Sequence, residues 1–97
     1  AAKSVSIENN IINALTQTAN NIELIKFNSY WTKDTPFDIL SAVVRGNTII
    51  SNLQSFGITT QYAGKDAPSY VIANNSLAKA KLVTKPNDTL SNNTLLP

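Results

Sequence analysis

Few side chains in this sequence could perform acid–base chemistry near neutral pH. There is no His and no Cys, which excludes the usual proton shuttle, the thiolate nucleophile and the soft metal ligands. Six carboxylates remain, no two of them adjacent: Glu8, Glu23, Asp34, Asp38, Asp66 and Asp88. A general acid–base pair would have to assemble from distant positions. We find no phosphate-binding loop, metal-ligand spacing or internal repeat, and we predict a chain that is not an enzyme and holds no cofactor or metal.

The lysines form one basic cluster, which consists of Lys79, Lys81 and Lys85, with Tyr70 nearby. Basic and aromatic side chains together are typical of single-strand nucleic-acid binding. Three lysines are also typical of a solvated strand face, and the rest of the chain has no basic stripe. With a formal net charge of only +2, we predict no nucleic-acid partner.

The composition indicates one small domain of 97 residues with a polar but weakly charged surface. Charged residues make up 14%, and 13 Asn, 9 Ser and 10 Thr replace them. Such a surface provides little electrostatic repulsion, which suits an assembly subunit. Because the chain lacks Met and begins with two alanines, we expect a processed protein in an exported or lumenal compartment (periplasm, extracellular space or a thylakoid-type lumen). The alternative is a cytosolic protein that has lost its first residues.

Residues 6–27 have the periodicity of an amphipathic helix. The apolar stripe consists of Ile7, Ile11, Ala14, Leu15, Thr18, Ile22 and Ile25, and the opposite face is rich in Asn. Ser4 or Ser6 could cap the start, and Glu8 would lie in the first turn, where the helix dipole favours an anion. The sequence predicts a first helix over residues 6–27.

A second helix is predicted over residues 36–56. Thr35-Pro36-Phe37-Asp38 has the pattern of a capping box, and Gly57 stands where a C-terminal cap belongs. Arg45 near its middle argues against a membrane span. The two helices would form an antiparallel hairpin, which makes the predicted fold mainly α, with α+β as the alternative.

The C-terminal third has a different pattern. Residues 69–83 indicate a β-hairpin around Asn74 and Asn75, because Asn tolerates positive φ, although a third helix stays open. Residues 84–97 indicate an extended tail, which leaves residues 1–83 as the domain. The tail would pack back on the domain or dock into a neighbour.

Apolar residues in excess of what the helical hairpin can cover suggest protein partners. Helix 1 could cover only one apolar face of helix 2. The predicted partner-binding residues are Tyr30, Trp31, Phe37, Leu40, Val44, Leu90, Leu95 and Leu96. We therefore predict a non-enzymatic structural, linker or stabilising subunit of a larger protein assembly, for which the soluble face of a membrane complex is one setting. The alternative is a free-standing exported binding module (an adhesin, an inhibitor or a small-ligand carrier) that uses the cleft between the helices beside Tyr30 and Trp31.

Overall fold

The computed structural model describes residues 3–27, 39–63 and 67–97, and these residues form a β-structure. The nine strands are β1 Lys3–Glu8, β2 Ile11–Ala14, β3 Glu23–Lys26, β4 Ile39–Arg45, β5 Thr48–Thr59, β6 Val71–Ala73, β7 Ser76–Val83, β8 Thr89–Ser91 and β9 Thr94–Leu96. One 3₁₀ turn, Gln61–Ala63, is the only helical element within the described ranges.

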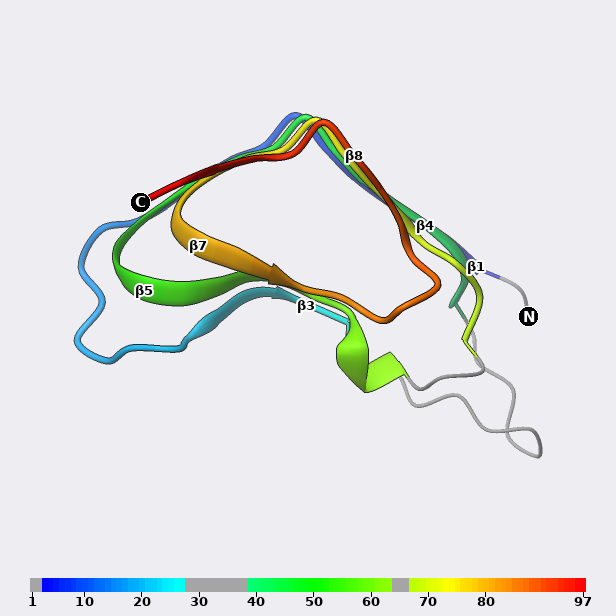
Figure 1. The fold of residues 1–97 in the computed structure, drawn as a ribbon, viewed down its shortest axis with the longest axis horizontal. Coiled ribbons are helices and arrows are strands. Elements are labelled where there is room, and N and C mark those ends of the chain that lie inside the picture. The colour runs from blue at the N-terminus through cyan, green and yellow to red at the C-terminus, as the bar shows by residue number, and fades with distance from the viewer. Residues whose placement is uncertain (1–2, 28–38, 64–66) are drawn as a thin grey trace.

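All strand pairs are parallel, and the chain alternates between two sheets. One sheet has the order β1-β4-β6-β8, and the other has the order β2-β5-β7-β9, with β3 also paired to β5. Each passage through both sheets is one rung, and four rungs stack into a parallel β-solenoid. In Figure 1, the successive rungs lie almost on top of one another at one corner.

The four rungs repeat an eight-residue unit at this corner: residues 6–13, 43–50, 71–78 and 89–96. In each unit, the second and seventh residues are apolar and form two columns. The first column is Ile7, Val44, Ile72 and Leu90, and the second is Ile12, Ile49, Leu77 and Leu95. The members in the two middle rungs are completely buried, so these columns form the core at the corner.

The turn of each unit contains a residue with positive φ followed by an asparagine. The first residues are Asn9, Gly46, Asn74 and Asn92, with φ of 57°, 69°, 57° and 55°. Gly and Asn adopt this left-handed conformation most readily. The second residues are Asn10, Asn47, Asn75 and Asn93, and their side chains form a hydrogen-bonded ladder from rung to rung. We call these four turns the asparagine corner.

The far side of the solenoid is wider and less regular. Ile25, Phe27, Ile58 and Tyr70 are buried there, and the rings of Phe27 and Tyr70 lie 5.2 Å apart. Gly57 lies within β5 with its backbone against β7. A Cβ atom at position 57 would lie 2.5 Å from Leu77 Cδ2, so close packing requires glycine here.

The predicted helical hairpin is wrong. Residues 6–27 contain β1, β2 and β3, and residues 39–56 of the second predicted helix belong to β4 and β5. The capping pattern at 35–38 lies outside the described residues. Each apolar stripe came from two short alternating strands joined by a turn, and short apolar runs of this kind do not distinguish a helix from strands.

The predicted β-hairpin and extended tail are also wrong. A turn is present at Asn74 and Asn75, but β6 and β7 on either side of it belong to different sheets. The tail contains β8 and β9, which pair with β6 and β7 and complete the fourth rung. Of the two arrangements predicted for the tail, the structure has the one in which residues 84–97 pack back on their own domain.

Candidate functional site

The described carboxylates are each paired with a cation, which leaves none free to act as a general base. Glu8 forms an ion pair with Arg45, and Asp88 forms one with Lys85. Glu23 Oε1 lies 3.3 Å from Lys26 Nζ. The other three carboxylates, Asp34, Asp38 and Asp66, lie outside the described residues. Among the residues that the structure describes, no group of acidic side chains is arranged to hold a metal ion.

Glu8 shows how such pairing affects ionisation. Ser6 Oγ donates a hydrogen bond of 2.6 Å to Glu8 Oε2, and the Arg45 guanidinium binds the other carboxylate oxygen. The hydrogen bond from Ser6 and, next, the contact with Arg45 lower the pKa of Glu8 below its ordinary value of 4.5. A carboxylate of this kind stays charged at neutral pH and is a weak proton acceptor.

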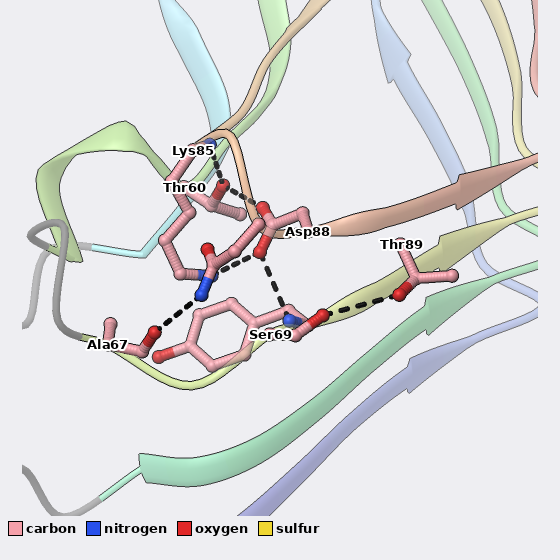
Figure 2. Close-up of polar contacts among 8 residues, drawn as sticks. Thr60, Ala67, Ser69, Lys85, Asp88 and Thr89 are labelled. Carbon is pink, nitrogen blue, oxygen red and sulfur yellow. Dashed lines mark hydrogen bonds and ion pairs between the residues drawn. The ribbon is translucent and has the colours of Figure 1, made fainter.

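The ion pair between Lys85 and Asp88 is buried on the far side of the solenoid (Figure 2). The two side chains are 2% and 0% exposed. Asp88 also accepts hydrogen bonds from Thr60 Oγ1 and, at 3.0 Å, from the backbone N–H of Tyr70. Lys85 Nζ lies 3.4 Å from the centre of the Tyr70 ring, a cation–π contact. We call these four residues the Lys85 cluster.

Three separate parts of the chain meet at the Lys85 cluster. Thr60 follows β5, Tyr70 precedes β6, and Lys85 and Asp88 form the turn between β7 and β8. Within that turn, the backbone N–H of Asp88 donates to the carbonyl of Lys85 at 3.1 Å, and the N–H of Lys85 donates to Thr60 Oγ1 at 3.1 Å. Close by, Asn87 Nδ2 donates to the carbonyl of Ala67 at 2.9 Å (Figure 2).

The charged groups of the Lys85 cluster are buried and bonded to one another. Asp88 has three donors, and its side chain has no exposed surface at which a substrate could bind. Burial and, to a smaller extent, the charge of Asp88 raise the pKa of Tyr70 above its ordinary value of 10.0, so its hydroxyl stays protonated at neutral pH. That hydroxyl has no hydrogen-bond partner among the described residues.

A second polar cluster fastens the segment after β2 to β5. Gln17 Nε2 donates to Ser51 Oγ at 2.6 Å and to Ser55 Oγ at 3.0 Å. Asn52 accepts from the backbone N–H of Gln17 at 3.1 Å and donates to its carbonyl at 3.0 Å. No basic group lies among these contacts to activate either serine, so this cluster is also a structural tie.

The two terminal rungs are the remaining candidate, because they expose the ends of the apolar columns. Leu90 is 46% and Leu95 is 54% exposed, whereas Ile72 and Leu77 in the preceding rung are 0% exposed. At the opposite end, the column residues Ile7 and Ile12 are half-buried, and the outward-facing Ile11 is 72% exposed. In the described part of the chain, the edge strands β1, β2 and β3 of the first rung and β8 and β9 of the last rung each have one neighbouring strand. These open edges are the described surface best suited to bind another protein.

The structure brings together some of the residues predicted to bind partners. Leu90, Leu95 and Leu96 lie on the last rung and are exposed. Leu40 is exposed on β4, whereas Val44 lies in the core with no exposed surface. The predictions for Tyr30, Trp31 and Phe37 fall outside the described residues. The cleft between two helices, on which the predicted binding module depended, is not formed because residues 6–27 and 39–56 form strands joined by turns and a loop.

Sequence reasoning did not identify the exposed edge of the first rung or the repeat that relates the four rungs. The sequence signal of this repeat is four Asn-Asn or Gly-Asn pairs, each with an apolar residue two positions before it and another two positions after it. The lysine cluster was also misjudged, because Lys79 and Lys81 are exposed whereas Lys85 is buried. Lys81 Nζ lies 4.8 Å from the centre of the Phe56 ring.

No helix in the described ranges is both long enough and apolar enough to cross a membrane. Comparisons of the chain with protein-family models, with curated proteins and with solved structures find no significant match.

Proposed function

We propose that this chain is a non-enzymatic structural module of a larger protein assembly, and that it binds its partners by strand addition at the open edges of its solenoid. The observation that carries the proposal is the exposure of Leu90 and Leu95 in columns whose two middle rungs are completely buried. Burying one such side chain completely contributes about 1.5–3 kcal/mol. An edge that exposes apolar core residues beside unpaired backbone groups favours the addition of another strand.

The composition of the last edge supports the same function. Proteins usually protect exposed edge strands with charged residues, proline or a bulge. β8 and β9 contain no charged residue and no proline, and their pairing with β6 and β7 continues without a register shift. Nothing in these two strands prevents another strand from pairing with them.

The rest of the described molecule is organised for rigidity. The described acidic side chains are paired with cations, the serine cluster fastens the segment after β2 to β5, and the turns are connected through side-chain amides. A structural or linker role uses these properties directly. An exported or lumenal location stays a prediction, as does an association with a membrane complex.

Site-specific crosslinking in the cells that produce the chain would test this function. A photoreactive phenylalanine analogue would replace Leu95, and the control would carry it at Tyr62, an exposed aromatic residue of the 3₁₀ turn. We expect a discrete adduct from position 95 that position 62 does not give, and mass spectrometry would identify the second protein. The same adducts from both positions, or none from position 95, would overturn the proposal.

A further inference from the structure

We infer that the partner of each open edge is a second copy of this chain, stacked head to tail so that the last rung of one copy meets the first rung of the next. This inference rests on the proposed function and names the partner. It follows from the hydrogen bonds between rungs, which are the same at all three internal junctions of the asparagine corner.

At each internal junction, two backbone hydrogen bonds connect the turns. The N–H of the positive-φ residue donates to a carbonyl of the next rung, as Asn74 does to Ser91 at 3.0 Å. The N–H of the first residue after the next asparagine donates back, as Thr94 does to Asn75 at 2.8 Å. The equivalent bonds at the two other junctions are Asn9 to Arg45, Thr48 to Asn10, Gly46 to Ala73 and Ser76 to Asn47.

Three side-chain hydrogen bonds complete each junction. The backbone N–H and the Nδ2 of one ladder asparagine both donate to the Oδ1 of the next, as Asn75 does to Asn93 at 3.1 and 3.0 Å. The Nδ2 of the second asparagine donates to a carbonyl of the earlier rung, as Asn93 does to Ile72 at 2.9 Å. The Nδ2 of Asn75 therefore donates to both neighbouring rungs, to Val44 in the rung before and to Asn93 in the rung after, whereas its Oδ1 accepts from the rung before.

The two ends of the solenoid carry the two halves of this pattern. The last rung presents the backbone N–H groups of Asn92 and Asn93, the second Nδ2 hydrogen of Asn93 and the carbonyls of Leu90 and Asn93. The first rung presents the complementary groups, which are the carbonyl of Glu8, the Oδ1 and Nδ2 of Asn10 and the N–H of Ile11. By analogy with the internal junctions, a head-to-tail contact would form the same five hydrogen bonds.

The side chains of the two ends are complementary as well. In the two apolar columns, Leu90 would meet Ile7 of the next copy, and Leu95 would meet Ile12. In the outward columns, Thr89 would meet Ser6, Ser91 would meet Glu8, Thr94 would meet Ile11, and Leu96 would meet Asn13. The junction would contain no pair of like charges, and it would cover the exposed ends of both apolar columns.

Because the two ends are different surfaces, the contact is heterologous, and stacking can continue to a third copy and beyond. A pairing of two identical ends would be related by two-fold symmetry and would stop at a dimer. Blocking one end distinguishes the two modes. In head-to-tail stacking, a chain with one blocked end can still bind a chain whose opposite end is blocked, because each keeps one complementary surface.

Sedimentation velocity of the purified chain over a wide concentration range would test the inference. We expect oligomers that lengthen as the concentration rises. Leu95→Lys should raise the dissociation constant at least about tenfold, because stacking would bury its ammonium group. Ile50→Lys is the matched control, because it adds the same charge to an exposed, outward-facing side chain of the second rung, which has a neighbouring rung on both sides, and it should leave association nearly unchanged.

A mixing experiment would then establish the direction of stacking. Ile11→Pro removes the N–H that points to the preceding copy, at the first residue of an edge strand, where proline is tolerated. Circular dichroism would verify that both variants fold. We expect Leu95→Lys and Ile11→Pro each to be monomeric alone and to form a 1:1 complex when mixed, because each retains one intact end.

Three results would overturn the inference. They are a wild-type chain that stays monomeric at every concentration, an Ile11→Pro variant that associates as well as the wild type, and two blocked variants that form no complex when mixed. If the wild-type chain is monomeric but position 95 crosslinks to a different protein in cells, the proposed function stands and head-to-tail stacking does not.

Discussion

The asparagine corner and the Lys85 cluster stabilise opposite sides of the solenoid in different ways. The asparagine corner repeats one neutral arrangement in every rung, and each side-chain amide bonds to a neighbouring rung. The Lys85 cluster occurs once, uses an ion pair, and is complete within itself. The comparison shows that the contacts of the corner recur from rung to rung, whereas the described contacts of the cluster link three particular segments.

The comparison also separates the energetic roles of the two regions. A desolvated ion pair costs much to bury, and the loss of one partner leaves a charge in the interior. A neutral amide ladder contributes smaller amounts at several places, and each contribution depends on how many neighbouring rungs are present. The loss in the free energy of unfolding should therefore be larger for substitutions in the Lys85 cluster, and in the asparagine corner it should depend on the position of the rung.

The largest effect is expected when one partner of the buried ion pair is removed. Lys85→Met would leave the carboxylate of Asp88 without its cation, which should lower the free energy of unfolding by about 3–5 kcal/mol. Urea denaturation followed by circular dichroism would measure it. Lys81→Met is the control, because Lys81 is exposed and its contact with the Phe56 ring is worth about 0.5–1 kcal/mol. Equal losses in the two variants would contradict the structural role of the Lys85 cluster.

An intermediate effect is expected within the asparagine corner, with a gradient along the ladder. Asn75→Ala should cost about 3 kcal/mol, since it leaves the amide groups of Asn47 without their acceptor and removes the donor to Val44. Asn93→Ala should cost less, about 2 kcal/mol, because it removes the acceptor of Asn75 and the donor to Ile72 but, unlike Asn75→Ala, no bond to a following rung. The protein should be measured at low concentration, so that stacking between copies does not contribute to the measured stability. A larger loss at Asn93 than at Asn75, measured by the same denaturation, would be inconsistent with the ladder.

The smallest effect is expected at Glu8, next to the asparagine corner. Its pKa is lowered in the folded chain, so its ionisation stabilises the fold above pH 4.5, and this stabilisation is lost as the pH falls through the folded pKa. The urea midpoints of the wild type and of Glu8→Gln should differ slightly at pH 7, with the wild type more stable, and should converge as the pH falls below 4.5. A difference that grows with acidification would have the wrong sign.

Some local features of this fold could be predicted from the sequence. Asn74 was expected to adopt positive φ in a turn, and its φ of 57° confirms this. Strands were expected over much of residues 69–83, where β6 and β7 lie. Both expectations depended on properties of single residues, namely the tolerance of Asn for a left-handed backbone and the preference of Val and Ile for strands.

The direction of pairing could not be predicted in the same way. Parallel strands are paired across long separations, here 37 residues between Asn10 and Asn47. A two-residue turn between strands is normally the signature of an antiparallel hairpin, and only long-range contacts show that β6 and β7 belong to different sheets. The rungs were missed as a repeat because the connections on the far side vary in length, so that the eight-residue units recur without a fixed period.

This variation in length affects the chain entropy of the fold. Successive ladder asparagines are separated by 37, 28 and 18 residues. The entropic cost of closing a flexible loop rises by about 0.6 kcal/mol for each doubling of its length, so closing the last interval costs about 0.6 kcal/mol less than closing the first. Forming the rung that Asn93 completes therefore costs the least chain entropy, although this rung, like the first, has only one neighbouring rung to stabilise it.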